Sequence, residues 1–192
     1  FKFNNAGLSL AWSYHPHAFE VRCNDQKSPY DVFYDYEIFS NGVRKALKGS
    51  FFQKRSFEEL MTQNPQTKEI IRGILRRVSG SQMVSNFRPI TASMLYKLFC
   101  DEGDTVWDMS CGWGGRLLGA LMSKRIHTYI GTDPSTLTYR GLGKMRDDFS
   151  YLGKNVELHC LGSEAYLPQP NSVDLCFTSP PYFDTERYSE ED

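Results

Sequence analysis

The second half of the sequence repeats one pattern, in which a short apolar run is followed by a turn and then by an amphipathic stretch. The pattern predicts four strands and two helices: strands at 105–109, 126–132, 156–161 and 173–178, and helices at 116–123 and within 135–152. Strands that alternate with helices form parallel sheets with right-handed crossovers. Ligands of such sheets bind beyond the carboxyl ends of the strands. The sequence therefore predicts an α/β fold whose site lies at the strand ends.

A glycine-rich turn follows the first strand and reads Asp-Met-Ser-Cys-Gly-Trp-Gly-Gly from Asp108. Glycines let the backbone turn sharply and approach a ligand, and the next helix offers free amide groups. The spacing departs from the dinucleotide-binding G-x-G-x-x-G. The carboxylate of Asp108 would repel a pyrophosphate and suits a ligand with a positive centre. We predict ligand binding by five residues of this turn: Asp108, Ser110, Cys111, Gly112 and Gly114.

The next two strand ends carry further candidate ligand contacts. Asp133 ends the second strand, about 25 residues after Asp108, where a carboxylate can accept both hydroxyls of a ribose. Asp133 could instead cap the next helix, with Pro134 in its first turn. After the third strand, the side chain of Ser163 could reach an adenine edge or could belong to an ordinary turn.

The fourth strand runs into a loop that reads Thr-Ser-Pro-Pro-Tyr-Phe over residues 178–183. Each proline fixes its own φ and moves the residue before it out of the helical region, so the loop is rigid. Such a loop holds its carbonyl groups and an aromatic face in place, as is needed to grip a flat heterocycle with an amino group. The alternative is a tight turn between a strand and a helix.

Together these motifs resemble the class I S-adenosylmethionine-dependent methyltransferases. The Ser179-Pro180-Pro181-Tyr182 motif is similar to the hallmark of the DNA amino-methyltransferases, which is Asp, Asn or Ser followed by Pro-Pro-Tyr. The segment Asn86-Phe87-Arg88-Pro89 resembles the family segment that binds the methionine part of the cofactor. The resemblance covers about residues 84–185. It implies a Rossmann-like sheet and S-adenosyl-L-methionine as the cofactor, with Phe87 and Arg88 among the residues that bind it.

The resemblance also implies a reaction at a base turned out of its helix. The exocyclic amine of a base is a poor nucleophile because its lone pair is delocalised into the ring. Ser179 Oγ and the Pro180 carbonyl would accept its two hydrogens, so that the lone pair turns toward the methyl group. Tyr182 would stack on the base and Phe183 would line the pocket. The expected catalytic set is Ser179, Pro180, Pro181 and Tyr182.

Several substrates and functions fit this pattern. Serine in the first motif position favours cytosine in DNA modestly, whereas aspartate or asparagine is commoner in adenine enzymes. Guanine amino-methyltransferases of transfer RNA carry similar loops, so an RNA substrate is the second hypothesis. A third hypothesis is a catalytically silent assembly subunit that keeps the fold.

Two domains are expected: a small, irregular, aromatic-rich α+β appendage at 1–55, and the methyltransferase domain at 56–192. In the appendage we predict two or three strands, with a possible hairpin at Asn41-Gly42. Its aromatic side chains could stack on bases or pack onto the main domain. Further helices are predicted at 56–61, at 66–78 and at 91–100, the last with Met94, Leu95, Leu98 and Phe99 facing inward.

Composition restricts the environment and the partners. No run of eighteen apolar residues exists, so we expect no membrane span. The five cysteines are odd in number and never spaced as metal ligands, which favours structural thiols in a reducing cytosol, without a metal. We expect a cytoplasmic or nucleoid-associated protein. The net charge of −1 weakens the case for strong nucleic-acid binding, although local basic clusters leave a DNA-facing surface open.

The resembled fold normally adds three strands after the Pro-Pro-Tyr loop. Here the sequence ends about ten residues beyond the loop, in the acidic stretch 186–192. A sheet of four strands would leave a hydrophobic edge exposed. We therefore expect a fragment, a split enzyme completed by a second chain, or a homo-oligomer that covers the edge.

Overall fold

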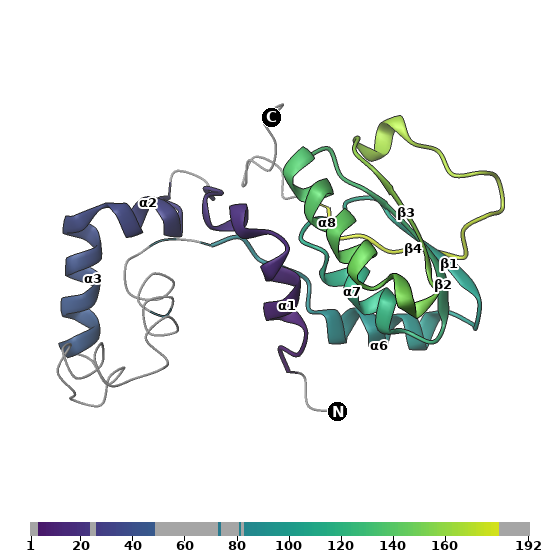
Figure 1. Ribbon diagram of the computed structural model, residues 1–192, viewed down its shortest axis with the longest axis horizontal. Helices are drawn as coiled ribbons and strands as arrows, with labels where there is room; N and C mark the ends of the chain where they lie inside the picture. The colour runs from purple at the N-terminus through teal and green to yellow at the C-terminus, as the bar shows by residue number, and fades with distance from the viewer. Residues whose placement is uncertain (1–3, 24–25, 49–72, 74–80, 82, 181–192) are drawn as a thin grey trace. The chain divides into compact units, whose positions relative to one another are not determined.

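The computed structural model describes residues 4–23, 26–48, 73, 81 and 83–180. The chain forms two compact units (Figure 1). The sheet unit comprises residues 1–18, 85–183 and 188–192, and the helical unit comprises residues 19–84 and 184–187.

This division differs from the expected boundary near residue 55, because residues 4–18 pack with the sheet unit. Helix α1 (Leu8–Ser13) places Ala11, which is fully buried, in one hydrophobic cluster with Ala92 and Leu117. A short 3-10 helix, η1 (Pro16–Phe19), follows α1. An apolar contact of this kind joins segments that are far apart in the sequence, so no local pattern reveals it.

The sheet confirms the predicted parallel α/β architecture. Its four strands are β1 (Asp104–Asp108), β2 (Ile126–Thr132), β3 (Asn155–His159) and β4 (Leu175–Cys176). They lie in the order β3-β2-β1-β4, and every neighbouring pair is parallel. The strand order reverses between β1 and β4, which makes their carboxyl ends the switch point of a Rossmann-like sheet.

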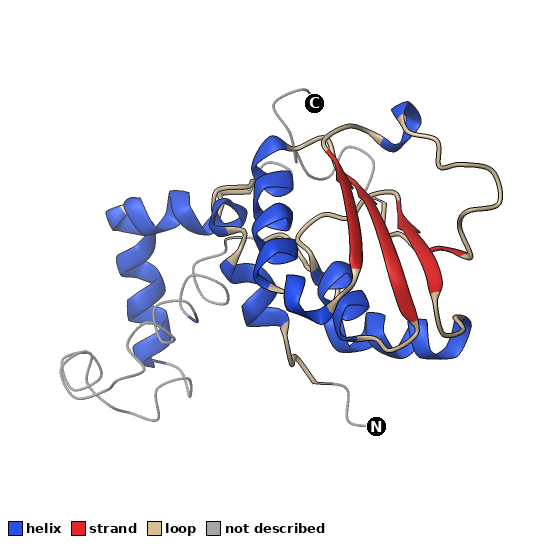
Figure 2. Cartoon of the chain, turned by 45° about the vertical axis from the view of Figure 1, so that its right-hand side comes forward, coloured by secondary structure: helices blue, strands red, loops and turns tan. Residues whose placement is uncertain are grey.

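Three helices pack on the sheet: α6 (Pro89–Phe99), α7 (Gly115–Met122) and α8 (Thr136–Asp148). Figures 1 and 2 show α7 and α8 on one side of the sheet, whereas the loop after β3 runs out on the other side. Alternate side chains of a strand point to opposite faces. On the helix-covered face, Val106 and Tyr129 are completely buried. On the second face, Ile130 is buried, but Trp107 is only half buried and Cys176 is exposed.

The second face is covered differently from the first. Parallel sheets are normally buried on both faces. Among residues 85–180, however, no α-helix lies on this second face, and the ring of Tyr166 packs there against His159 (centroid distance 4.1 Å) and Trp107 (6.0 Å). Three buried side-chain atoms on this face have no hydrogen-bond partner within the described residues: Trp107 Nε1, His159 Nε2 and Thr178 Oγ1.

Helix α6 forms where it was predicted, but its buried face differs from the expected one. Leu98 and Phe99 are exposed, and the buried residues are Pro89, Ala92 and Tyr96. The contact with α7 decides this orientation, because Tyr96 Oη donates to the Arg116 carbonyl at 3.2 Å. Contacts between helices determine which residues of a helix are buried. The hydrophobic pattern of one helix does not reveal these contacts.

The helical unit corrects the expectation of strands in the N-terminal region. Residues 26–48 form α2 (Pro29–Tyr34) and α3 (Tyr36–Lys48), so the predicted hairpin at Asn41-Gly42 is wrong and this dipeptide lies inside α3. The helices predicted at 56–61 and 66–78 lie outside the described residues, apart from Gly73. None of the described helices is long and apolar enough to cross a membrane.

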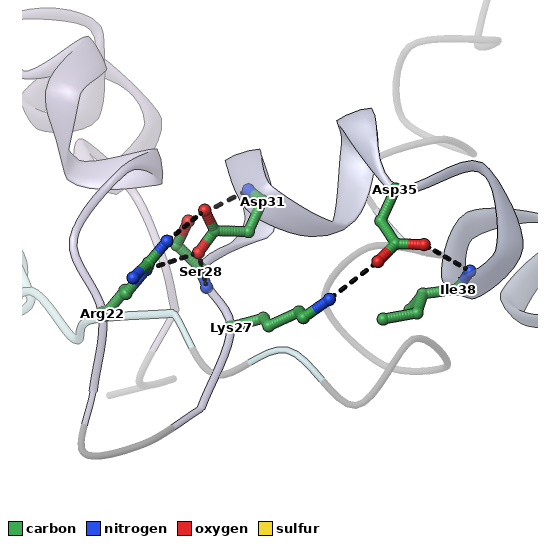
Figure 3. Close-up of polar contacts among 6 residues, drawn as sticks. All are labelled: Arg22, Lys27, Ser28, Asp31, Asp35 and Ile38. Atoms are coloured by element: carbon green, nitrogen blue, oxygen red, sulfur yellow. Dashed lines mark hydrogen bonds and ion pairs between the residues drawn. The ribbon is translucent and has the colours of Figure 1, made fainter.

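A network of capping hydrogen bonds explains why this segment forms helices rather than strands (Figure 3). Ser28 and Asp31 form a reciprocal capping box, and Pro29 occupies the first helical turn of α2. Asp35 Oδ1 then accepts a hydrogen bond from Ile38 N at 3.1 Å at the start of α3. These local bonds satisfy some of the free amide groups at both helix starts, which outweighs the turn preference of the Asn-Gly pair.

The close approach of α6 and α7 should depend on Gly119. A Cβ atom there would lie 2.6 Å from Ala92 Cβ and 2.8 Å from the Pro89 carbonyl oxygen. We expect Gly119→Ala to lower the free energy of unfolding by about 1–3 kcal/mol through overpacking, measured by urea denaturation. Gly143→Ala in α8 is the matched control, because its Cβ meets nothing within 4 Å. It should be neutral or stabilising by about 0.4–1 kcal/mol, and equal effects would contradict this interpretation.

Candidate functional site

The predicted glycine turn lies between β1 and α7 and is fastened to the end of β2. Cys111 N donates to the Thr132 carbonyl at 3.0 Å. Gly112 (φ 51°) and Gly114 (φ 73°) adopt left-handed backbone conformations, which side chains with a Cβ disfavour. Burial raises the pKa of the Cys111 thiol well above its ordinary value, so this cysteine stays protonated. The turn thus has the backbone geometry that the sequence predicts, without a reactive thiol.

The segment around Phe87 lies directly against this turn. Asn86 Nδ2 donates to the Trp113 carbonyl at 3.0 Å. A Cβ atom at Gly115 would come within 1.9 Å of the Phe87 carbonyl oxygen, so only glycine fits there. The exposed Arg88 occupies the N-cap of α6. The structure therefore brings together two motifs that lie more than twenty residues apart, and Asn86 and Gly115 make the contacts between them.

Asp108 is completely buried in a network within the chain. Its Oδ2 accepts from Arg116 Nε at 2.6 Å and from Tyr129 Oη at 2.7 Å, and its Oδ1 accepts from Ser110 N at 3.3 Å. Burial lowers the pKa of Arg116, but the Asp108 carboxylate outweighs this effect and raises it. The sequence analysis assigned this carboxylate to a cationic ligand, whereas here both of its oxygens have partners inside the protein.

The buried guanidinium also shapes the turn and touches the neighbouring segment. Arg116 Nη2 donates to the Ser110 carbonyl, and the guanidinium lies over the Phe87 ring, with its carbon 5.6 Å from the ring centroid. Neither Arg116 nor Tyr129 was predicted as a site residue. Burial, and then the Asp108 charge, raise the pKa of Tyr129 well above its ordinary value, so its hydroxyl remains a hydrogen-bond donor.

Asp133 lies at the carboxyl end of β2, where it was expected, with 9% of its surface exposed. Its Oδ2 accepts from Gly112 N at 2.9 Å, and its Oδ1 accepts from Ser135 N at 3.0 Å. The N-cap of α8 is Ser135 rather than Asp133. A carboxylate offers about four acceptor positions, so the two used here leave acceptor capacity for ligand hydroxyls.

The ionisation of Asp133 is perturbed. Burial raises the pKa of its carboxyl to about 6, although the hydrogen bonds from the Ser135 and Gly112 amides act in the opposite direction. A buried carboxyl with a raised pKa beside a glycine turn is typical of functional sites as well as of structural networks. Its charge therefore changes within the range of pH in which the protein can be studied.

The third strand end brings together residues that the sequence analysis missed. Ser163, which was predicted to face an adenine, begins the 3-10 helix η4 (Ser163–Ala165) and is half buried. His159 ends β3, and its carbonyl accepts from Asp133 N at 3.1 Å, so the ends of β2 and β3 are joined. Its ring stacks on Tyr166. The predicted third strand ran on to residue 161, so the sequence analysis placed His159 inside the strand, whereas β3 ends at this residue.

The fourth strand end runs toward the segment around Phe87. Phe177 N donates to the Trp107 carbonyl at 3.0 Å, and the Phe177 ring contacts the rings of Phe87 (centroid distance 5.4 Å) and Tyr96 (5.5 Å). Ser179 and Pro180 follow and are exposed. The remaining predicted residues of this loop, Pro181, Tyr182 and Phe183, lie outside the described residues.

Comparison with known proteins gives distant likenesses only. No family model and no curated protein matches the chain. Among solved structures, a geranyl diphosphate methyltransferase in complex with SAM has a TM-score of 0.43 and 13% identity over 61% of this chain and 44% of its own. A putative methyltransferase from Porphyromonas gingivalis W83 has a TM-score of 0.31 and 16% identity over 64% of this chain and 35% of its own.

A third solved structure is the methyltransferase subunit of a type I restriction-modification system from Streptococcus thermophilus. It has a TM-score of 0.40 and 17% identity over 81% of this chain and 39% of its own. The chain thus spans less than half the length of each of these three proteins. Likenesses this distant do not indicate an activity. The activity of this chain therefore has to be inferred from its own residues.

The buried network of Asp108 should contribute strongly to stability. We expect Tyr129→Phe to lower the free energy of unfolding by about 1.5–3 kcal/mol, because it removes a hydrogen bond to a buried charge. Urea denaturation measures the change. Tyr151→Phe is the control, since Tyr151 is exposed, and it should have no measurable effect. A Tyr129→Phe variant as stable as the unaltered protein would show that the Asp108 network does not depend on this hydroxyl.

Asp133 should titrate near pH 6 in the folded protein. Its folded pKa lies above the unfolded value of about 3.9, so the folded protein holds this proton more tightly between about pH 4 and pH 6. The contribution of Asp133 to stability therefore falls as pH rises through that window and is constant above it. Carbon-detected NMR should show a carboxyl midpoint near 6, assigned by its loss in Asp133→Asn. A midpoint near 4 would contradict the burial argument.

Proposed function

We propose that this chain binds S-adenosyl-L-methionine and acts in methyl transfer to the exocyclic amine of a nucleic-acid base. One observation carries the proposal: the Phe87 segment, the glycine turn and the strand end that leads into the Ser-Pro-Pro-Tyr motif adjoin one another at the switch point. Phe87 is in van der Waals contact range of Gly115 in the glycine turn, and its ring contacts Phe177, two residues before Ser179. This is the part of an α/β sheet where ligands bind.

The chain's residues fit the parts of such a cofactor. The free acceptor positions of Asp133 suit the two ribose hydroxyls, and its raised pKa makes this contact dependent on pH. Ser163 remains the proposed contact to the adenine edge. Phe87 and Arg88 would hold the methionine part, together with the turn residues Ser110, Cys111, Gly112 and Gly114. Asp108 would act through Arg116, which its charge holds against the turn.

The proposed transfer needs positioning and no covalent enzyme intermediate. When bound, the cofactor supplies an electrophilic methyl group on a sulfonium. Ser179 Oγ and the Pro180 carbonyl would accept the two hydrogens of the amine and turn its lone pair toward the methyl carbon. The amine that accepts the methyl group would then lose a proton to solvent. Pro181 would hold the loop rigid, Tyr182 would stack on the base and Phe183 would line the pocket.

A base in DNA is the proposed substrate, with cytosine favoured over adenine because serine opens the Pro-Pro-Tyr motif. Guanine in transfer RNA is the alternative substrate, and a silent assembly subunit is the alternative from another class. A second chain or a second copy is the proposed partner of the sheet. The half-exposed second face of the parallel sheet supports such a partner, because sheets of this kind are normally covered on both sides.

Calorimetry with S-adenosyl-L-methionine tests the cofactor. We expect the unaltered protein to bind it and Asp133→Ala to weaken binding at least tenfold, about 1.4 kcal/mol, because the ribose hydroxyls lose their acceptor. Asp147→Ala, an exposed carboxylate on α8, is the matched control and should bind normally. Binding by the unaltered protein should also weaken as pH falls below 6. The proposal fails if no binding occurs, or if both variants bind as the unaltered protein does.

Methyl transfer to DNA and to transfer RNA separates the substrate hypotheses. With a labelled methyl donor, we expect label in DNA, and nucleoside analysis should find it on the cytosine amine. Ser179→Ala should lower the rate about 100-fold, as for other losses of a positioned hydrogen-bonding group, with cofactor affinity unchanged. Label in transfer RNA alone would favour the guanine enzyme. Cofactor binding without any transfer would favour the silent subunit.

A further inference from the structure

The helical unit exposes four large aromatic side chains within seven residues. Tyr30 and Phe33 are each 47% exposed, Tyr34 is 69% exposed and Tyr36 is 84% exposed. We call these four residues the aromatic surface. Single exposed apolar side chains are common on proteins, but clustered ones mark interaction sites. This surface plays no part in the cofactor site described above.

Three of the four rings hold one another in place. The ring centroids of Tyr30 and Tyr34 are 4.7 Å apart, and those of Phe33 and Tyr34 are 5.3 Å apart. The Phe33 ring also contacts Phe39 on α3 at 5.8 Å. A hydrogen bond with the Tyr34 hydroxyl raises the pKa of Tyr30. Rings that are positioned in this way lose little side-chain entropy when a flat ligand stacks on them.

The geometry of α2 explains why these rings face outward. Pro29 and Val32, three residues apart, form its buried side. Tyr30, Phe33 and Tyr34 follow the spacing of a second helical stripe, which is the exposed one. A helix that buries small side chains and exposes large aromatic ones reverses the usual pattern. Such a reversal costs solubility and is expected where the exposed rings bind a partner.

The charges of the helical unit favour a polyanionic partner. Figure 3 shows that Arg22 pairs with Asp31 and Lys27 with Asp35, each at 2.7 Å, so these two carboxylates of the α2 region are neutralised. Residues 19–84 contain eleven Lys and Arg against eight Asp and Glu, and residues 184–187 add one Arg, one Asp and one Glu, so the helical unit has a net charge of +2. The rest of the chain therefore carries −3, because the whole chain carries −1. Positive charge is thus concentrated in the unit that carries the rings.

Two of these cations, Arg44 and Lys45, are exposed on α3, which packs against α2. We propose that the aromatic surface binds single-stranded nucleic acid, with unpaired bases stacked on its rings and phosphates held by the neighbouring cations. Stacking on aromatic side chains beside a basic surface is how single strands are held without sequence preference. The inference rests on the proposed function for the kind of substrate, and it gives that substrate an unpaired form.

Fluorescence anisotropy with a labelled mixed-sequence oligonucleotide of about 20 nucleotides, as a single strand and as a duplex, tests this inference. We expect the single strand to bind more tightly than the duplex. The double variant Tyr34→Ala/Tyr36→Ala should weaken single-strand binding at least tenfold, because each stacked base contributes about 1–3 kcal/mol. Tyr151→Ala is the matched control, since Tyr151 is 76% exposed on the sheet unit, and it should stay within about twofold, which is below 0.5 kcal/mol.

Charge reversal provides a second readout. Arg44→Glu/Lys45→Glu should weaken binding and reduce the steepness of its dependence on salt, because phosphate contacts release counterions. Circular dichroism verifies that each variant is folded. The inference is overturned if the single strand does not bind, if the duplex binds more tightly, or if the tyrosine variant binds normally. A tyrosine variant that loses self-association or a protein partner while it still binds the single strand would also overturn it.

Failure of this inference can be distinguished from failure of the proposed function. The anisotropy experiment contains no methyl donor, and the calorimetry of the cofactor contains no nucleic acid. Single-strand binding without cofactor binding would refute the methyltransferase proposal and keep the aromatic surface. If the cofactor binds and the methyl group is transferred equally well with and without Tyr34 and Tyr36, the methyltransferase proposal stands and the aromatic surface is refuted.

Discussion

The buried ion pair between Asp108 and Arg116 is the interaction on which the sheet unit depends. It joins the end of β1 to the start of α7, and the Tyr129 hydroxyl adds β2 to the same carboxylate. Loss of one partner of such a pair costs about 3–5 kcal/mol, because the other charge is left buried and uncompensated. The pair also determines the shape of the glycine turn, since Arg116 donates to the Ser110 carbonyl. A structural network and the candidate site therefore share the same atoms.

Close backbone contact is the second constraint on the site. Gly115 allows the Phe87 carbonyl to reach the glycine turn, and Gly119 allows α6 to approach α7. Because α6 begins directly after Arg88, the approach of the two helices also positions the Phe87 segment. The aromatic contact between Phe87 and Phe177 then aligns the start of the Pro-Pro loop with both. Packing of helices on the sheet thus brings together the parts of the candidate site that are distant in the sequence.

The parallel sheet could be predicted because its signals are local. Apolar runs such as 126–132 coincide with β2, and the glycines after β1 mark the turn that the structure contains. The N-terminal region was harder, because the turn preference of Asn41-Gly42 competes with helix signals nearby. The Ser28 capping box stabilises the start of α2 and Asp35 stabilises the start of α3, and residues 41–42 are helical. The turn propensity of two residues contributes less free energy than the hydrogen bonds that cap a helix start.

What the sequence by itself determined was the α/β class, the order of strands and turns, and Asp133 as a residue at a strand end, since each follows from spacing along the chain. Only the tertiary structure decided that Asp108 faces Arg116 rather than open space, that residues 4–18 complete the sheet unit, and that Asp133 is buried enough to titrate near pH 6. These properties depend on which distant atoms come within a few ångströms and on how much water they exclude. Neither quantity is a function of local sequence, because both arise only when the chain has packed.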